Sequence, residues 1–140
     1  MSGPEVSEAD FAVFEQAIIS VRHAVFILEQ GVPFELEIDG CDPGCRHALI
    51  LSDELPVATG RITANGKIGR VAVLKSHRNR GYGRAIILKL EEIARTTGLD
   101  QTYLGAQIDA IGFYQNLDYR PYGEIFMDAG IKHIHMRKSL

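Results

Sequence analysis

A short stretch in the middle of the chain combines three arginines with two closely spaced glycines. It reads Arg78-Asn79-Arg80-Gly81-Tyr82-Gly83-Arg84, and it lies between a β-branched segment and a long amphipathic segment. If the second segment is a helix, its first amides are unpaired donors with a partial positive charge, which bind phosphate. The guanidinium groups add cationic donors beside them. The stretch therefore predicts a site for a pyrophosphate.

Two other nucleotide-binding motifs do not fit this stretch. A P-loop needs Gly-Lys-Ser or Gly-Lys-Thr after a spaced glycine, and neither is present. The dinucleotide fingerprint needs a third Gly or Ala where Ile86 stands. It also needs a parallel sheet, which the hairpin expected just before this stretch contradicts. A basic, solvated turn that ends in glycine is the remaining structural alternative.

The run Arg78-x-x-Gly81-x-Gly83 resembles the acetyl-CoA pyrophosphate loop of the GNAT superfamily of N-acyltransferases, in a likeness that covers nearly the whole chain. The resemblance implies that acetyl-CoA is the co-substrate and that the strand before the loop separates from its neighbour to hold the pantetheine arm. It also implies that the loop amides hold the diphosphate, with Arg78 alongside. The cofactor-binding residues expected on this basis are Val71, Ala72, Val73, Arg78, Asn79, Arg80, Gly81, Tyr82, Gly83 and Arg84.

Residues 111–119, Ile-Gly-Phe-Tyr-Gln-Asn-Leu-Asp-Tyr, are similar to the family's helix-then-strand signature, in which a tyrosine faces the sulfur of CoA. That tyrosine corresponds to Tyr114, which we expect to be the general acid. A phenol of pKa about 10 and a thiol of pKa about 8.5 are matched closely enough for proton donation to the departing thiolate. We expect a backbone N–H of the separated strand, most simply that of Val73, to polarise the thioester carbonyl. The alternative for Tyr114 is a half-buried aromatic on a short helix.

Residues 68–74 contain no carboxylate, although many members of the superfamily carry a glutamate base there. The candidate replacements are Glu29, at the end of the first expected helix, and His133, in the last expected strand. Their alternatives are a surface carboxylate and a strand-facing histidine. Deprotonating an amine of pKa about 8 at pH 7 costs about 1–1.5 kcal/mol, against about 4–5 kcal/mol for a lysine. We therefore expect the amine of a small metabolite as the acceptor, rather than a protein lysine.

Residues 22–26, 29–33, 37–40 and 133–136 are similar to a subgroup of small bacterial GNAT proteins. This subgroup is linked to glucosamine-phosphate N-acetyltransferases, which implies an amino sugar phosphate or a similar amine as the acceptor. Glu35, Glu37 and Asp39 are either a solvated acidic loop or a group that attracts a cationic amine. The alternative functions are a non-catalytic CoA-binding or regulatory module and the acetylation of a protein or peptide amine.

Composition limits the partners and the location of the protein. The 140 residues carry a formal net charge of -3, which argues against nucleic-acid binding through a basic face. No apolar run reaches 18 residues and the N-terminus is acidic and polar, so we expect no membrane partner and a cytoplasmic protein. Cys41 and Cys45 lack the second paired motif of a structural zinc site, and we expect no metal.

The elements that position these residues follow from periodicity and turn residues. Helices are expected over residues 14–28, 83–97 and, with Asp109 as N-cap, 110–117. Strands are expected over residues 47–51, 56–64, 67–74, 99–107, 119–122 and 131–137.

The second and third of these strands form a hairpin at Asn65-Gly66. The helix over residues 83–97 is a crossover that makes the strands on either side of it parallel. The expected class is α+β, and the resemblance implies the GNAT fold, a mixed, mostly antiparallel twisted sheet flanked by helices. We expect one domain over residues 1–140, a frayed end over residues 1–9, and an exposed sheet edge that suits a homodimer.

Overall fold

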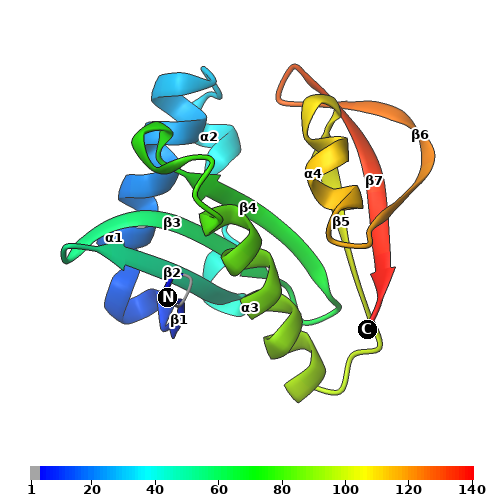
Figure 1. Cartoon of the computed structure of the whole chain (residues 1–140). Coiled ribbons are helices and arrows are strands. Elements are labelled where there is room, and N and C mark those ends of the chain that lie inside the picture. Colours follow the sequence, from blue (N-terminus) through cyan, green and yellow to red (C-terminus); the bar gives the residue numbers. More distant parts are fainter. Residues whose placement is uncertain (1–3) are drawn as a thin grey trace.

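The computed structural model describes residues 4–140, which form the elements shown in Figure 1. The strands are β1 (Ser7–Ala9), β2 (Arg46–Ser52), β3 (Leu55–Ile62), β4 (Lys67–Val73), β5 (Gln101–Gln107), β6 (Arg120–Asp128) and β7 (Ile131–Ser139). The α-helices are α1 (Phe11–Arg22), α2 (Phe34–Glu37), α3 (Tyr82–Thr96) and α4 (Ile111–Gln115). A π-helix, η1 (His23–Glu29), continues α1, and the short 3₁₀ turns are η2 (Asp42–Gly44), η3 (Lys75–His77) and η4 (Ile108–Ala110).

The strands form one seven-stranded sheet in the order β1-β2-β3-β4-β5-β7-β6. β4 and β5 are parallel, and every other neighbouring pair is antiparallel. The α+β class and the mixed sheet flanked by helices are confirmed, and so are the crossover helix and the parallel pair beside it.

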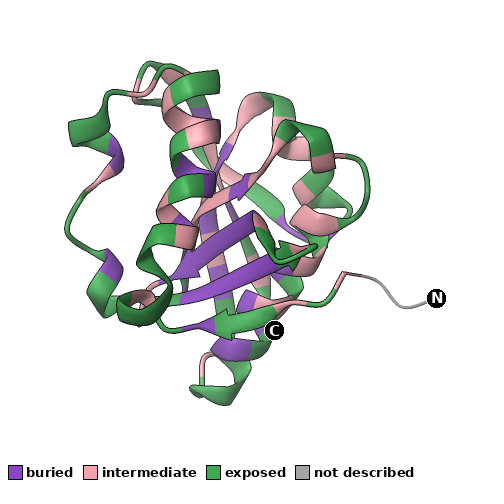
Figure 2. Ribbon diagram, turned by 90° about the vertical axis from the view of Figure 1, so that its left-hand side faces the viewer, coloured by how far each residue is buried: buried purple, intermediate pink, exposed green. Residues whose placement is uncertain are grey.

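Two helices cover opposite faces of the first half of the sheet. Ala48 and Ile50 of β2 belong to the core cluster that includes α3, whereas Leu49 between them packs with Ile18 of α1. Successive strand residues point to opposite faces, so α1 and α3 lie on different sides. β2 and β3 are consequently buried on both faces, as the purple strands in Figure 2 show.

The contact between α3 and the sheet is close enough to require a glycine. A Cβ added at Gly60 of β3 would lie 2.6 Å from the Cγ2 of Ile86 and 3.1 Å from Cδ1 of Leu90. Both of these α3 side chains are fully buried. Gly60 therefore lets α3 approach the sheet, and this fixes where the helix begins relative to the end of β4.

Two local expectations were wrong. Ser7–Ala9 is not frayed, because it pairs with β2 and buries Ala9 against Ile18 and Leu49; residues 1–3 of the expected frayed end lie outside the described residues. The helix expected over residues 14–28 is confirmed, although the spacing did not predict that its second half, η1, is a π-helix. Asp109 is not an N-cap, since it lies within η4 and α4 begins after Ala110 without a side-chain cap.

β4 and β5 separate soon after they meet. Their ladder contains only two register pairs, Lys67 with Tyr103 and Ile68 with Leu104. Beyond these pairs β4 keeps β3 as its neighbour but loses β5, and the ribbons diverge in Figure 1. Arg70 has a positive φ of 49° at the register shift between β3 and β4. Such a bulge increases twist and bends the strand, which accounts for the separation.

Phe11–Glu29, which combines α1 and η1, is long and apolar enough to cross a membrane by length and composition alone. The expectation that no apolar run reaches 18 residues is therefore wrong for this helical segment. In the fold, α1 packs on β2, β3 and β4, and its Arg22 is 1% exposed and ion-paired. One face of the segment thus packs on the sheet of this domain, although only 22% of its apolar 18-residue window is buried.

Candidate active site

The edge of β4 that faces the separation carries free backbone groups. The N–H of Leu74 donates to the carbonyl of Val57 in β3 at 2.9 Å. Because backbone direction alternates along a strand, the amide of Val73 points the other way, into the separation. The same alternation turns the amide of Val71 to this side and that of Ala72 toward β3, where Ala72 pairs with Thr59. Val71 and Val73, rather than all three residues, therefore offer backbone groups to a ligand between β4 and β5.

The predicted glycine-rich turn leads directly into the first turn of α3. Gly81 is its N-cap, with a φ of 83° and no side-chain cap. The first helical bond runs from the N–H of Ala85 to the carbonyl of Gly81, so the amides of Tyr82, Gly83 and Arg84 have no helical partner. Three adjacent N–H donors at the start of a 15-residue helix form an anion-binding end.

Gly83, the second glycine of the turn, does not have a positive φ; it is required because a neighbouring side chain lies close to it. A Cβ at Gly83 would lie 3.3 Å from Cζ of Phe113 in α4 and 3.7 Å from Cγ2 of Val73. Absence of a side chain at Gly83 therefore lets α4 and the end of β4 pack against the turn. Tyr114, the next residue after Phe113, is held beside the separation as a result.

The arginines of the turn differ in their contacts. Arg80 and Arg84 are exposed, and neither forms an ion pair within residues 4–140. Arg78 donates from its two terminal nitrogens to the Glu29 carboxylate at 2.5 and 2.6 Å and from Nε to the Val73 carbonyl at 3.1 Å. The structure therefore brings Arg78 and Glu29 to each other, although the sequence suggested separate roles for them.

Pairing with Arg78 changes the acid–base character of Glu29. The hydrogen bonds from the guanidinium lower the pKa of Glu29 below its usual range. A carboxylate with a lowered pKa is a weaker proton acceptor, so Glu29 is less suited to be the general base than the sequence suggested.

Tyr114 lies among aromatic rings at the α4 side of the separation. Its ring makes edge contacts with Phe113 and Tyr119, with centroids 5.0 and 5.9 Å apart. Burial raises the pKa of Tyr114 to about 12, so the phenol is protonated at neutral pH. The phenol can donate a proton, but a pKa of about 12 is further from the thiol pKa of about 8.5 than the ordinary phenol value of about 10 is.

His133 lies opposite the end of β5. It is 9% exposed, stacks on Phe126 with centroids 5.6 Å apart, and pairs in register with Gln107. Its Nδ1 is 2.7 Å from the carbonyl of Ile131, which only accepts hydrogen bonds. The proton therefore belongs on Nδ1, and Nε2 of the neutral ring carries a lone pair that can accept a proton.

Three arginines that the sequence did not single out neutralise most of the acidic segment. Arg22 donates to Glu37 at 2.5 Å and to Asp42 at 2.7 Å. Arg61 donates to Asp42 at 2.9 Å and to Asp39 at 2.6 Å. The third, Arg70, bonds carbonyls of α2, and all six side chains form what we call the buried ion network: Arg22, Arg61, Arg70, Glu37, Asp39 and Asp42.

The buried ion network overturns both expectations for Glu37, and it pairs Asp39 with Arg61 and Arg70. Glu37 is 3% exposed, and hydrogen bonds from Arg61 hold the pKa of Asp39 well below its usual range. Burial alone raises the pKa of Asp42, but Arg22 and Arg61 outweigh it and leave that pKa lowered. Glu37 and Asp42 are therefore not solvated, whereas the Asp39 side chain stays 30% exposed. All three carboxylates are held by arginines and are not free to attract an amine. Glu35 alone of the expected three is exposed without an ion pair in the described chain.

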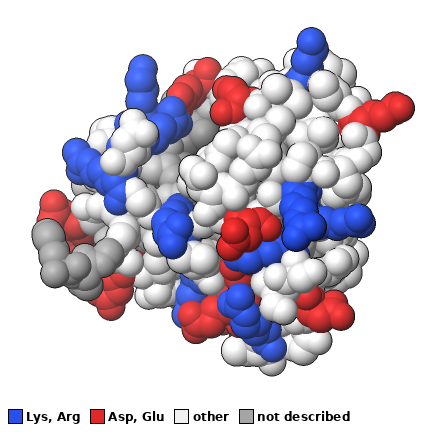
Figure 3. Space-filling view, turned by 45° about the vertical axis from the view of Figure 1, so that its right-hand side comes forward, with Lys and Arg blue, Asp and Glu red and all other residues white. Residues whose placement is uncertain are grey.

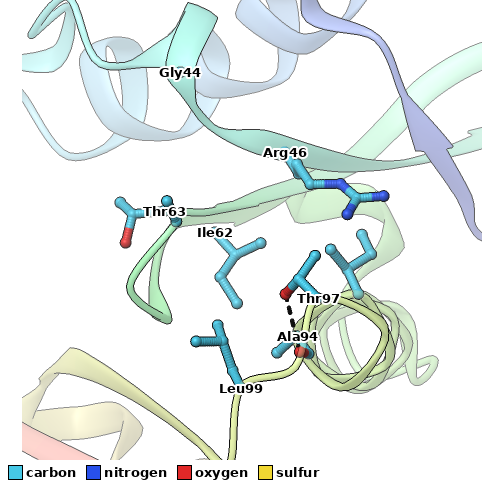
Figure 4. A pocket seen from close by; sticks show the side chains of 9 residues that line it. Gly44, Arg46, Ile62, Thr63, Ala94, Thr97 and Leu99 are labelled. Carbon is cyan, nitrogen blue, oxygen red and sulfur yellow. Dashed lines mark hydrogen bonds between the residues drawn. The ribbon is translucent and has the colours of Figure 1, made fainter.

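Two hollows among the described residues lie away from this site. One, of about 170 Å³, is enclosed by the end of α3 and by β3 (Figure 4), where the Thr97 hydroxyl donates to the Ala94 carbonyl at 3.0 Å. The other, of about 450 Å³, lies beside β6 and β7 and includes Arg120 and Arg137 in its lining. The face in Figure 3 has both signs of charge interspersed rather than one basic field.

Cys41 is exposed, and burial raises the pKa of the half-buried Cys45. Within residues 4–140, no three His, Cys, Asp or Glu side chains gather in a way that would hold a metal ion. His47, which follows the cysteines, instead places Nε2 at 2.9 Å from the carbonyl of Asp42. The two thiols and this histidine do not form a joint site in the described chain.

The chain is similar to a known protein family and to bacterial relatives. A family profile described as "Acetyltransferase (GNAT) domain" matches residues 15–140. The chain is 42% identical over 123 residues to YjcF of Bacillus subtilis, described as an uncharacterized N-acetyltransferase, covering 85% of this chain and 88% of that one. It is 33% identical over 133 residues to ElaA of Escherichia coli, covering 89% and 86%.

Solved structures share the fold over nearly the whole chain. The crystal structure of Escherichia coli ElaA superimposes with a TM-score of 0.85 at 30% identity, covering 96% of this chain and 99% of that one. An acyl-CoA N-acyltransferase from Pseudomonas aeruginosa gives a TM-score of 0.85 at 25% identity, covering 97% and 99%.

Proposed function

Because the chain belongs to the GNAT acetyltransferase family, we propose that it transfers the acetyl group of acetyl-CoA directly to a primary amine of a small metabolite, with both substrates bound together. The observation that carries this proposal is the separation of β4 from β5, which ends beside the uncapped N-terminus of α3. It combines a free strand edge for an extended amide-bearing chain with an anion-binding end for a diphosphate.

The residues beside the separation suit acetyl-CoA. The amides of Tyr82, Gly83 and Arg84 would hold the diphosphate, because they have no helical partners. Arg80 and Arg84 are exposed cations next to them. Backbone groups of Val71 and Val73 would hold the pantetheine arm, and the lack of a Cβ at Gly83 lets Phe113 and Val73 pack closely against the turn beside them.

Three groups of the chain have roles in the transfer. The amine attacks the thioester carbonyl, so that a C–N bond forms, the C–S bond breaks and the amine loses a proton. The Val73 N–H stabilises the negative charge on the carbonyl oxygen, a contribution worth about 3–4 kcal/mol for such donors. Tyr114 protonates the departing sulfur, and Nε2 of His133 accepts the amine proton directly or through a water molecule.

The proposed acceptor is an amino sugar phosphate or a similar small amine. Glu37, Asp39 and Asp42 are already paired with arginines, so they do not provide a negative field for a lysine side chain. An amine of pKa about 8 loses its proton more cheaply than a lysine. We also propose that the protein acts in the cytoplasm, because both cysteines are free thiols, and that it forms a homodimer through an exposed sheet edge.

A ligand panel tests the proposal in two stages. Thermal shifts are measured with acetyl-CoA, CoA, ATP and NAD; a ligand at 100 times its Kd adds about 2.7 kcal/mol to the free energy of unfolding. We expect shifts with the two CoA compounds only, and a preference for ATP or NAD would contradict the proposal. Thiol release is then followed with amino sugars, α-amines and peptide lysines. Turnover of peptide lysines alone rejects the acceptor class, and binding without any turnover indicates a regulatory module.

A further inference from the structure

The last residue of η1 and the residue after it make contacts on opposite sides of the separation. Glu29 accepts two hydrogen bonds from Arg78, in the turn that follows β4. Gln30 accepts one at 3.1 Å from Nε2 of Gln107, the last residue of β5. We refer to Glu29, Gln30, Arg78 and Gln107 as the strap.

The strap is the main side-chain link across the open end of the sheet. In the described chain, the bond between Gln30 and Gln107 is the only side-chain hydrogen bond between residues 4–81 and residues 101–140. The backbone pairs of β4 and β5 lie at the other, closed end. The strap therefore joins the two strands where the ladder no longer does.

The local backbone explains how neighbouring residues contact two separate strands. The N–H of Gln30 bonds to the carbonyl of Val25, five residues back, at 3.0 Å, and Gly31 ends the turn with a φ of 72°. A π-turn contains one more residue than an α-turn and occurs often at functional sites. The wider turn places Glu29 and Gln30 together over the separation.

We infer that the strap is a positioning device for acetyl transfer, which holds the Val73 amide and the end of β5 at the spacing that the thioester requires. This inference depends on the proposed function. Arg78 contacts the Val73 carbonyl with Nε and Glu29 with both terminal nitrogens, so three of its five N–H donors are used in these bonds. These bonds fix the orientation of the guanidinium, and we assign Arg78 a role through Val73 rather than on the diphosphate, and Glu29 a role through Arg78 rather than as the base.

Kinetics of four proteins with two thioesters distinguish a positioning role of Arg78 from binding of the diphosphate. Wild type, Arg78→Met, Glu29→Gln and the double variant are compared with acetyl-CoA and with S-acetylpantetheine, which lacks the diphosphate. If Arg78 positions Val73, either single change lowers kcat by about tenfold, and the double variant is no worse because both changes break one unit. The KM values for the two thioesters then change by the same factor, less than about threefold.

Other roles give opposite results. If Arg78 binds the diphosphate, Arg78→Met weakens acetyl-CoA alone, and Glu29→Gln strengthens it by freeing the guanidinium. If Glu29 is the base, Glu29→Gln lowers kcat far more than Arg78→Met and removes a limb of the pH profile. Either pattern overturns the inference. Failure of the proposed function is a different result, because wild type would then neither bind nor consume acetyl-CoA.

The glutamine arm has its own test. Gln30→Ala and Gln107→Ala each remove the bond across the separation, and we expect kcat to fall by about three- to tenfold with an unchanged Kd for acetyl-CoA. Gln16→Ala is the matched control, since Gln16 is an exposed glutamine of α1 without a side-chain hydrogen bond in the described chain. Equal activity of all three variants would reject the strap, and Tm values identical to wild type would exclude a folding defect as the cause of any loss.

Discussion

Two sets of arginine–carboxylate contacts differ in the burial of their central members, although Arg70 and Asp39 at the rim of the buried ion network are 24% and 30% exposed. The buried ion network contains Arg22, 1% exposed, whereas the side chains of Glu29 and Arg78 are both 36% exposed. Removing one partner from a buried pair leaves a charge without solvent, but water replaces a lost partner at the surface. The comparison indicates that the first set maintains the fold and the second adjusts the geometry of the separation.

The largest expected effect separates the two sets by stability. Arg22→Met leaves Glu37 and Asp42 buried without this partner, and we expect a loss of about 3–5 kcal/mol in the free energy of unfolding. Arg78→Met, at the exposed pair, should cost about 0–1 kcal/mol. Urea denaturation of both variants measures the difference. Equal losses would show that burial does not divide the two sets as we describe.

A second comparison concerns two tyrosines whose rings touch. Tyr119 is 2% exposed, its hydroxyl donates to Glu91 at 2.8 Å, and it is 2.7 Å from the hydroxyl of Thr102. The Tyr114 hydroxyl has no such partner in the described chain. Tyr114→Phe should lower kcat about 10²-fold with little change in Tm, because it removes the proposed proton donor.

Tyr119→Phe should have the reverse effect. It leaves the buried Glu91 and Thr102 groups with one partner fewer, so we expect a loss of about 1–3 kcal/mol of stability and an almost unchanged kcat. Steady-state kinetics and thermal melts of the two variants provide the readouts. A kcat that falls equally in both variants would exclude a specific role for Tyr114.

Acid should act on the buried ion network in a defined pH range. The folded-state pKa values of Asp39 and Asp42 are lowered, so their ionised forms stabilise the fold above the unfolded pKa of about 3.9. This contribution disappears as the pH falls through the lower folded-state values. We expect Arg61→Met to destabilise the protein at pH 7 and to flatten the decline in stability below about pH 4. A pH series of urea denaturation measures it, and an unchanged slope would contradict the assignment.

The smallest expected effect compares two glycines near α4. A Cβ at Gly83 meets Phe113 at 3.3 Å, whereas one at Gly112 meets nothing within 4 Å. Gly83→Ala should cost about 1 kcal/mol and weaken acetyl-CoA binding, while Gly112→Ala should stabilise the helix by about 0.5–1 kcal/mol. Thermal shift with and without acetyl-CoA tests both. Tighter binding by Gly83→Ala would show that Phe113 moves away from the turn without cost.

Local pattern was enough to predict the glycine-rich turn and the strands around it. Asn65-Gly66 and the β-branched runs on both sides specify a hairpin through short-range backbone preferences. Gly81 and Gly83 mark the start of α3 for similar reasons. The prediction of Asp109 as an N-cap was wrong because a 3₁₀ turn, which contains Asp109, precedes α4 and makes Ala110 the N-cap. The spacing of polar and apolar residues does not predict such a turn.

Long-range pairing decided the rest of the site. The three arginines of the buried ion network are far in sequence from the carboxylates that they contact. No local sequence pattern indicates which arginine pairs with which carboxylate. Glu29 and Arg78 are likewise 49 residues apart, and Gln30 and Gln107 are 77 apart. Only the packing of α1 on β4 and the separation of β5 bring them together.

Taken alone, the amino-acid sequence determined the fold class, the crossover helix and the glycine-rich turn at the start of α3, because each depends on periodicity or on glycine conformation over a few neighbouring residues. The tertiary structure alone decided which charges neutralise one another and which groups remain free to act on a substrate. The physical reason is that desolvation and pairing depend on distances in space, which sequence separation does not specify.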